Sequence, residues 1–344
     1  MKEYVGIQYL RGLAAILVVV YHSMAMVAVN PYFPYPIGDF GVDVFFVISG
    51  FIMWTTTTQK KVTPSNFFKA RLFRVFPLYW IFTCILLISI FAVPSAFINQ
   101  RNLDASFIIK SFLLVPAYNP DVGDITPLYT VGWTLVYEMF FYIVFALSLF
   151  IPFAKARLVI LIASFSLLVL AGGLMSPQGA AALTYTNPLL LEFLAGVIVG
   201  VSANRLSKLN VKLGFAFVGA AVILLILGCM NEATLSRAIA FGPGATLLVA
   251  SSLVFEKYFS SKPNRLALLL GGASYSMYLA HPFAQRAWYI VETRITGGIS
   301  TMSGAVIYSV GAVIAGIVGG LICYVIIEKP LLSMKHKMRI LRAR

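Results

Sequence analysis

Two ionisable residues stand at the ends of one apolar stretch near the start of the chain. Arg11 and His22 enclose a run of aliphatic residues that is typical of a helix within a membrane. They are 11 positions apart, about three helical turns, so they would share one face roughly 16 Å apart along the axis. An ionisable side chain inside a span is costly and usually functional. The stretch therefore predicts a cation near one membrane surface and an imidazole, the usual general base near neutral pH, near the other.

A cleaved signal peptide is the alternative interpretation of this stretch. Lys2 and Arg11 would form its basic region, and residues 13–20 would form its apolar core. However, Met26 stands where a small residue should precede a cleavage site. We therefore keep the stretch as a membrane span.

The composition places the chain among polytopic membrane proteins. Of its 344 residues, 60% are hydrophobic and 11% are charged, against about 25% charged in soluble domains. Its three cysteines lie in apolar runs, with neither a disulfide framework nor the spacing of metal ligands. No phosphate-binding loop or dinucleotide fingerprint is present. We predict no metal site and no bound cofactor.

Apolar segments long enough to cross a membrane fill the chain from end to end. A span needs about 20 mostly apolar residues, and we predict about ten, at 7–29, 41–57, 76–93, 133–151, 157–175, 188–203, 213–229, 238–255, 266–285 and 304–327. Residues 107–115 form an apolar piece too short to span, which predicts an interfacial or re-entrant segment. Gly316 and Gly320 have the spacing that lets membrane helices pack closely. We expect an all-α protein made of one membrane domain, residues 1–344, with no soluble domain.

Lys and Arg, which favour cytoplasmic loops, orient these spans. With the N-terminus inside, 20 of the 26 fall in inside segments and 5 in outside segments. We therefore predict that both termini are cytoplasmic, the second within a basic tail at about 329–344. This surplus is a signal of topology that also suits anionic lipid, and it does not indicate a nucleic-acid partner.

This orientation sorts the polar residues into two layers. The predicted outer layer holds His22, Asp43, Glu138 and His281, and the inner layer holds Arg11, Arg71 and Arg74. Each has a plainer interpretation. Asp43 would cap its helix, His281 would be a satisfied helix-end residue before Pro282, Glu138 would lie at the interface, and the arginines would anchor topology. Two opposed layers favour a protein that holds an anion inside and moves protons outside.

Five segments, in this order, resemble the acyltransferase-3 family of membrane O-acyltransferases. They are RGLAAILVVVYHS from Arg11, GVDVFFVISGFI from Gly41, KARLFRVFPLYW from Lys69, LYTVGWTLVYEMFFY from Leu128 and SYSMYLAHPF from Ser274. The likeness is strongest to the bacterial exopolysaccharide branch, the succinoglycan-type acetyltransferases. It implies transfer of an acyl group, usually acetyl from acetyl-CoA, to sugar hydroxyls of glycans built at the bacterial inner membrane. Many family members add a soluble hydrolase-like domain, whereas this chain ends shortly after its last predicted span.

The resemblance also assigns roles to residues. It implies that Arg11 and His22 form the family's Arg-x10-His motif, with Glu138, Asp43 and Ser49 in further family motifs and Arg71 and Arg74 as a paired basic motif. We expect His22 to act as a general base oriented by Glu138 or Asp43, or to form an acyl-histidine intermediate.

Donor and acceptor sites follow from the two layers. The donor candidates share positive charge, which suits the phosphates of CoA: Arg11, Lys69, Arg71 and Arg74. The acceptor-side candidates are polar or aromatic, as in many sugar sites: Ser49, Tyr118, Asp121, Asp124, Trp133, Tyr278 and His281. The expected partners are acyl-CoA, a glycan or lipid-linked oligosaccharide, membrane lipids and glycan-assembly machinery.

Two other classes of protein stay open from the sequence. A proton-coupled exporter of a glycan precursor or a small acid would also place His and Glu within spans. A non-catalytic scaffold for glycan assembly would not require His22. Transport of labelled substrate without acyl-CoA would identify the exporter.

Overall fold

A computed structural model describes residues 4–26, 28–33, 37–93, 103–231 and 234–333. Its regular structure within these residues is helical, apart from one isolated β-bridge between Tyr118 and Ile125. Nine of the described helical segments are long and apolar enough to cross a membrane. The prediction of an all-α, multi-pass membrane protein is confirmed. The end of the predicted basic tail, residues 334–344, lies outside the described residues.

The chain divides into two compact parts, which are described separately. One comprises residues 1–48 and 199–344, and the other comprises residues 49–198. The first contains α1 (Val5–Met24), η1 (Asn30–Tyr32), α9 (Val211–Met230), α10 (Arg237–Val254), α11 (Glu256–Ser261), α12 (Arg265–Gly272), α13 (Ser274–Thr296), α14 (Met302–Cys323) and the π-helical turn η4 (Tyr324–Glu328). The second contains α3 (Pro64–Ala92), α4 (Ala105–Leu113), η3 (Thr130–Gly132), α5 (Trp133–Ser148), α6 (Ala154–Met175) and α7 (Ala180–Tyr185). Helices α2 (Gly41–Gln59) and α8 (Leu190–Leu206) contribute residues to both.

Helix α1, which carries Arg11 and His22, is fixed at its start by a carboxylate from α11. The backbone N–H groups of Val5 and Gly6 donate to the two oxygens of Glu256, at 3.0 and 2.9 Å. The N-cap residue Tyr4 makes no side-chain cap of its own, so Glu256 satisfies N–H groups that a helix otherwise leaves open. A negative charge there is also favoured by the helix dipole.

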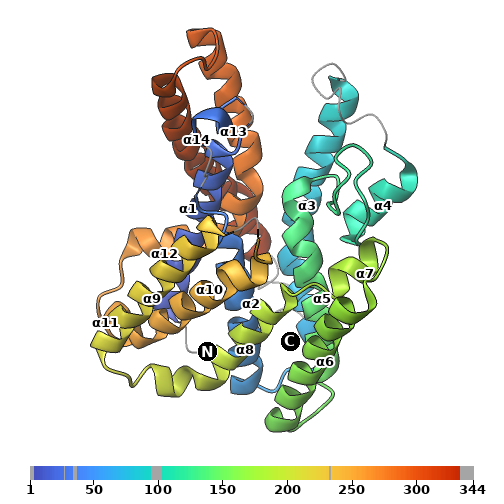
Figure 1. Ribbon diagram of the computed structural model, residues 1–344, viewed down its shortest axis with the longest axis vertical. Coiled ribbons are helices and arrows are strands. Elements are labelled where there is room, and N and C mark those ends of the chain that lie inside the picture. The colour runs from blue at the N-terminus through green and yellow to red at the C-terminus, as the bar shows by residue number, and fades with distance from the viewer. Residues whose placement is uncertain (1–3, 27, 34–36, 94–102, 232–233, 334–344) are drawn as a thin grey trace. The chain divides into compact units, whose positions relative to one another are not determined.

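Small residues let α14 lie directly against two neighbouring helices (Figure 1). A Cβ atom at Gly316 would fall 2.6 Å from Val19 Cγ1 in α1, and one at Gly320 would fall 2.4 Å from Met277 Cγ in α13. Neither distance leaves room for a side chain. The close packing predicted from the spacing of these two glycines is therefore confirmed.

The predicted ninth span, 266–285, is wrong as a single helix. The structure has two helices there, α12 and α13, which meet at Ala273, and α13 continues to Thr296. The second half of α13 carries Glu292, which is buried and accepts from Thr296 Oγ1 at 2.9 Å. A prediction from hydropathy places the end of a span before such a residue, because the scale does not show that a neighbouring hydroxyl donates a hydrogen bond to the carboxylate. Neither α12 nor α13 is among the nine apolar segments.

Whether α13 crosses the membrane decides the side of the C-terminus, because ten crossings return the chain to its starting side and nine do not. From the charge asymmetry, we expect reporters placed in the link 60–63 and after Arg344 to read as cytoplasmic. Alkaline phosphatase and fluorescent-protein fusions would measure this. A periplasmic signal at the C-terminus, with a cytoplasmic signal in the link, would show that α13 does not cross.

In the second part, the short helix α4 is tied to α3. Tyr79 Oη donates to the carbonyl of Ser111 at 2.8 Å, and Ser111 Oγ accepts from the backbone N–H of Leu128 at 2.9 Å. Asp104 caps α4 by accepting from the N–H of Phe107 at 2.6 Å. The predicted piece at 107–115 is thus largely a capped helix, which begins two residues earlier than expected.

Candidate active site

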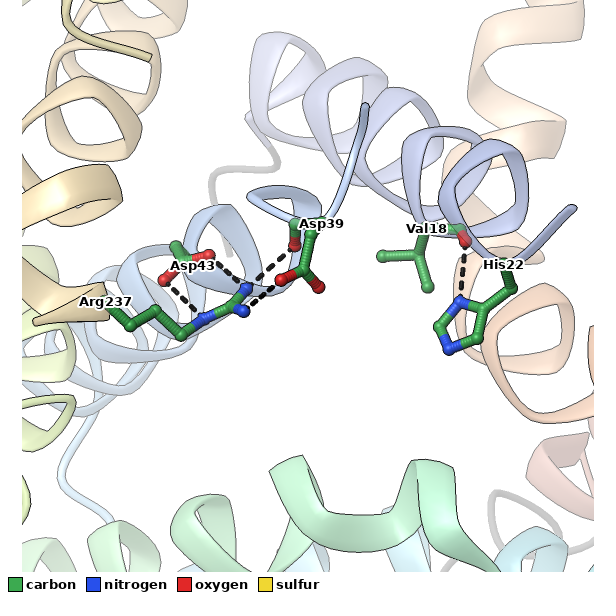
Figure 2. A network of polar contacts seen from close by, with 5 residues as sticks. All are labelled: Val18, His22, Asp39, Asp43 and Arg237. Atoms are coloured by element: carbon green, nitrogen blue, oxygen red, sulfur yellow. Dashed lines mark hydrogen bonds and ion pairs between the residues drawn. The ribbon is translucent and has the colours of Figure 1, made fainter. Parts of the chain in front are cut away.

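His22 lies near the end of α1 with a defined tautomer. Its Nδ1 is 2.9 Å from the carbonyl oxygen of Val18, one turn earlier (Figure 2). A carbonyl oxygen can only accept, so Nδ1 carries the hydrogen and donates it. In the neutral ring the lone pair is therefore on Nε2. This is the arrangement that a general base needs, with one nitrogen held and the other free to accept a proton.

A second imidazole lies beside the first. The ring centroids of His22 and His281 are 4.7 Å apart. His281 is fully buried, and its Nδ1 is 3.1 Å from the carbonyl of Met277. Its Nε2 is buried without a hydrogen-bond partner among the described residues. A buried acceptor without a hydrogen bond is rare in folded proteins and calls for an explanation, of which a catalytic role is one.

The plainer interpretation of His281, as a helix-end residue, is wrong. The residue lies in the interior of α13, which runs from Ser274 to Thr296 and passes through Pro282. The side chain packs inside the first part, where Gly316 of α14 comes close to its Cβ. Its predicted place among the acceptor-side residues stays a prediction.

Asp43 is held by an arginine that sequence reasoning did not connect to it. Arg237, the first residue of α10, donates from Nε to Asp43 Oδ1 at 3.1 Å and from Nη2 to Oδ2 at 2.6 Å. The same guanidinium pairs with the side chain of Asp39 and donates to its backbone carbonyl (Figure 2). Asp43 is fully buried, so this bidentate pair compensates a charge that would otherwise be very costly. The partners are 194 positions apart in the sequence, which explains why no spacing pattern pointed to the pair.

This pairing changes the expected role of Asp43. Both carboxylate oxygens accept from Arg237, and the carbonyl of Val18 orients His22. The ion pair joins the start of α2 to the start of α10, so Asp43 has an evident positioning role. Its predicted catalytic role remains a prediction.

Glu138 is the centre of a second polar cluster, in the part formed by residues 49–198. Its Oε1 accepts from Ser49 Oγ at 2.7 Å and from the hydroxyl of Tyr142. The two hydroxyls are 3.3 Å apart. Ser49, predicted on the acceptor side, is thus a partner of Glu138. Tyr142 was not predicted, although its position four residues after Glu138 on one helix face was the available signal.

Arg71 lies against this cluster. Its guanidinium carbon is 6.0 Å from the ring centroid of Tyr142 and 5.8 Å from that of Phe67. Its Nε is buried and has no hydrogen-bond partner among the described residues. Tyr142 thus contacts both Arg71, which was predicted in the inner layer, and Glu138, which was predicted in the outer layer. The two residues lie closer together than that assignment suggested, and their depth in the membrane stays a prediction.

The other donor candidates differ in how exposed they are. Lys69 is exposed, and Arg74 is half-buried on the same helix, α3. Arg11 is half-buried on α1 and donates to Gln8 Oε1 at 3.1 Å. Of these four, Arg71 contacts the Glu138 cluster through the ring of Tyr142.

The acceptor-side candidates fall in both parts of the chain. Tyr278 is buried beside His281, with 6.2 Å between ring centroids, and Trp133 begins α5 with its ring edge to Tyr137. Asp121 and Asp124 lie in a tight turn, where the N–H of Asn119 donates to the carbonyl of Asp124 at 2.8 Å. Tyr278 and His281 belong to the first part of the chain, and the other acceptor-side candidates belong to the second.

Tyr118 borders a surface hollow in the second part. The hollow has a volume of about 300 Å³, and its lining includes Asp104, Lys110 and the exposed ring of Tyr118. That volume is at the lower end of the range for small-molecule sites. An exposed aromatic ring with a carboxylate and an ammonium group at its rim suits a sugar-sized ligand.

Within the described part of the chain, no three or more His, Cys, Asp or Glu side chains are grouped so that they could hold a metal ion. The polar groups that the structure brings together are the two imidazoles in one part and Glu138, Ser49, Tyr142 and Arg71 in the other.

Comparison with known proteins gives consistent results. Residues 4–325 match the family described as "Acyltransferase domain". The chain is 37% identical over 311 residues to the exopolysaccharide production protein ExoZ of Rhizobium meliloti, covering 89% of this chain and 93% of that protein. It is 25% identical to the O-acetyltransferase OatA of Staphylococcus aureus, covering 80% of this chain but 49% of that longer protein. It is also 28% identical to the acyltransferase MdmB of Streptomyces mycarofaciens, over 112 residues. No solved structure matches.

The family match covers nearly the whole chain, and it includes every residue of both polar clusters. The predicted resemblance is thereby confirmed, and with it the class of reaction. The chain belongs to the acyltransferase-3 family, and it is a multi-pass membrane O-acyltransferase.

Proposed function

We propose that this enzyme transfers an acetyl group from cytoplasmic acetyl-CoA to a sugar hydroxyl of an exopolysaccharide or other surface glycan, as a lipid-linked repeat unit, at the bacterial inner membrane. The observation that carries the proposal is His22, whose Nδ1 is fixed by Val18 so that Nε2 is left as a base. The names of the relatives from Rhizobium and Staphylococcus support the acceptor class and the acetyl group.

In this proposal His22 handles one proton twice. Its Nε2 takes the proton of the sugar hydroxyl as the oxygen attacks the thioester carbonyl, which forms the new C–O bond. Collapse of the intermediate breaks the C–S bond, and the imidazolium returns the proton to the departing thiolate. A positioned base of this kind contributes about two to four orders of magnitude to the rate.

His281 suits the role of partner to the protonated state. When His22 is charged, Nε2 becomes a donor, and the buried Nε2 of His281 is an unsatisfied acceptor on a ring 4.7 Å away. A hydrogen bond between the rings would stabilise the imidazolium without adding a charge to the site. His281 would thus act through His22.

Arg71 is the strongest candidate for contact with the donor. Its guanidinium carbon lies over the rings of Phe67 and Tyr142, and an aromatic ring cannot replace an oxygen as acceptor for the N–H groups. Phosphate oxygens would accept from those groups. Arg74, three residues later on α3, adds a second positive charge on the same helix face.

We expect Arg71→Ala to raise the KM for acetyl-CoA by about tenfold or more, the worth of a hydrogen bond to a charged group, with less effect on the KM for the acceptor. Arg71→Lys should recover only part of the loss, because an ammonium cannot replace a planar fork. Steady-state kinetics on purified protein would measure both constants. Unchanged donor kinetics in Arg71→Ala and in Arg74→Ala would reduce the pair to topology anchors.

The hollow beside Tyr118 is our candidate for the acceptor. Sugars stack on exposed aromatic rings, and Asp104 and Lys110 would hydrogen-bond hydroxyl groups at its rim. Its volume of about 300 Å³ suits one or two sugar units rather than a long chain.

The direct test uses wild-type protein in proteoliposomes with radiolabelled acetyl-CoA and the host glycan precursor. Acetyl transfer to the glycan, identified by mass spectrometry as an O-acetyl ester, is the expected result. Label that crosses the membrane without appearing on any glycan, or transport of glycan without acetyl-CoA, would instead support the exporter.

A further inference from the structure

Arg157, at the start of α6, is a buried cation whose charge no described carboxylate pairs with. Its side chain is 7% exposed, and its Nε has no acceptor among the described residues. A guanidinium cannot lose its charge at any ordinary pH. Burial of a charged guanidinium without an anion is unfavourable. Ionisable residues buried in membrane proteins are therefore candidates for a functional role.

The one described contact of the guanidinium leaves its hydrogen-bond donors free. Its central carbon is 5.1 Å from the ring centroid of Trp54 in α2, and Trp54 is itself buried. An indole ring attracts the face of the guanidinium, but it does not accept from the N–H groups at the edge. The ring therefore holds the group in place and leaves it able to bind an anion.

The helix end around Arg157 is also unusually positive. Helix α6 begins at Ala154, its N-cap residue Phe153 makes no side-chain cap, and its first turn contains no acidic residue. Lys155 and Arg157 occupy that turn instead. Open N–H groups and the helix dipole make a helix start favourable for anions and unfavourable for cations. Two cations at an uncapped helix start are therefore electrostatically unfavourable. A bound anion would interact favourably both with the cations and with the helix dipole.

We propose that the start of α6 is an anion subsite for a phosphate group, formed by Arg157 and the first-turn N–H groups, with Trp54 positioning the guanidinium and Lys155 adding positive charge at the surface. We call it the α6 anion subsite. Lys155 and Phe153 are exposed, so the start of α6 lies at the surface of the protein. The charge pattern of the chain places this end of α6 on the cytoplasmic side.

The phosphate has two chemical sources on that side. One is the 3′-phosphate or diphosphate of acyl-CoA, an assignment that rests on the proposed function. The other is the headgroup of an anionic lipid, for which a basic residue at the membrane surface is also suited. Both present the same oxygens to Arg157, so the experiment must vary them independently.

The test uses the full-length protein in nanodiscs of phosphatidylcholine, with and without phosphatidylglycerol. Binding of CoA and of dephospho-CoA is measured by calorimetry, and stabilisation by each ligand is measured by thermal unfolding. The variants are Arg157→Gln, which removes the charge, and Arg157→Lys, which keeps the charge and loses the planar fork. Arg205→Gln is the matched control, because Arg205 is an exposed arginine on the same predicted side of the membrane.

If CoA is the source, the Kd for CoA should rise at least tenfold in Arg157→Gln, less in Arg157→Lys and not in Arg205→Gln. Loss of the preference for CoA over dephospho-CoA would assign the 3′-phosphate, and an equal loss for both would assign the diphosphate. If lipid is the source, CoA binding should stay unchanged, and the stabilisation by phosphatidylglycerol should disappear in Arg157→Gln.

Arg157→Gln should also fold without ligand at least as well as wild type, because it removes an uncompensated buried charge. A lower melting temperature without ligand, together with unchanged responses to CoA and to phosphatidylglycerol, would make Arg157 a structural partner of Trp54 and overturn the proposal. Failure of wild-type protein to bind CoA at all would count against acetyl-CoA as donor. The lipid comparison would still decide whether the α6 anion subsite exists.

Discussion

Replacing His22 by Ala should reduce acetyl transfer by about two to four orders of magnitude, the usual worth of a positioned base. The ring is held by one hydrogen bond to Val18, within its own helix, so its loss should leave the fold and acetyl-CoA binding intact. Transfer is measured as labelled acetate on the glycan, and donor binding by thermal stabilisation. His22→Gln should be as inactive, because an amide keeps hydrogen bonding but cannot take a proton.

Two comparisons separate the possible roles of the histidines. His281→Gln should lower the rate less than His22→Ala and shift the pH profile of kcat, because it removes an acceptor for the protonated ring and not the base itself. Label from acetyl-CoA trapped on the protein without acceptor, and absent from His22→Ala, would indicate an acyl-histidine. Substantial glycan acetylation by His22→Ala would contradict either mechanism.

Replacing Arg237 by Ala should lower the free energy of unfolding by about 3–5 kcal/mol, because it leaves the fully buried carboxylate of Asp43 without its cation. The expected fall in melting temperature is about 10 °C, measured by thermal unfolding in detergent. Arg237→Lys should recover only part of this, because a point charge cannot bond both oxygens of Asp43 and also Asp39.

The double variant Asp43→Asn with Arg237→Gln should be more stable than Arg237→Ala alone, because two neutral amides can bond each other and the fully buried carboxylate of Asp43 is removed. Arg294→Ala is the matched control, since Arg294 is exposed on the last turn of α13. If Arg237→Ala and Arg294→Ala have the same melting temperature, the ion pair does not stabilise the fold, and a catalytic role for Asp43 gains support.

The sequence by itself determined the elements and the class of protein. In a bilayer the backbone N–H and C=O groups have no water to bond, so an apolar run of about 20 residues forms a helix. Most span positions were therefore predictable within a few residues. The predicted end of the ninth span at residue 285 was wrong, because α13 continues to Thr296 through the buried carboxylate of Glu292. A scale of hydropathy counts Glu292 as polar, and it cannot count the hydroxyl of Thr296 that satisfies the carboxylate.

Candidate site residues were also visible, since an ionisable residue in an apolar run is conspicuous wherever it falls. Arg11, His22, Arg71 and Glu138 could all be named in advance. Partners one helical turn away were predictable in principle, as Tyr142 is from Glu138, because helix periodicity alone brings them together.

Only the tertiary structure decided which of these groups meet. Arg237 is 194 residues from Asp43, and His281 is brought to His22 only because α13 packs on α1. Arg71 and Glu138, sorted to opposite sides by their order along the chain, share Tyr142. The physical reason is that hydropathy fixes a residue's depth along its own helix only approximately, whereas pairing depends on which helix faces touch. Those faces are selected by small residues such as Gly316 and Gly320 and by buried charges that must find a partner.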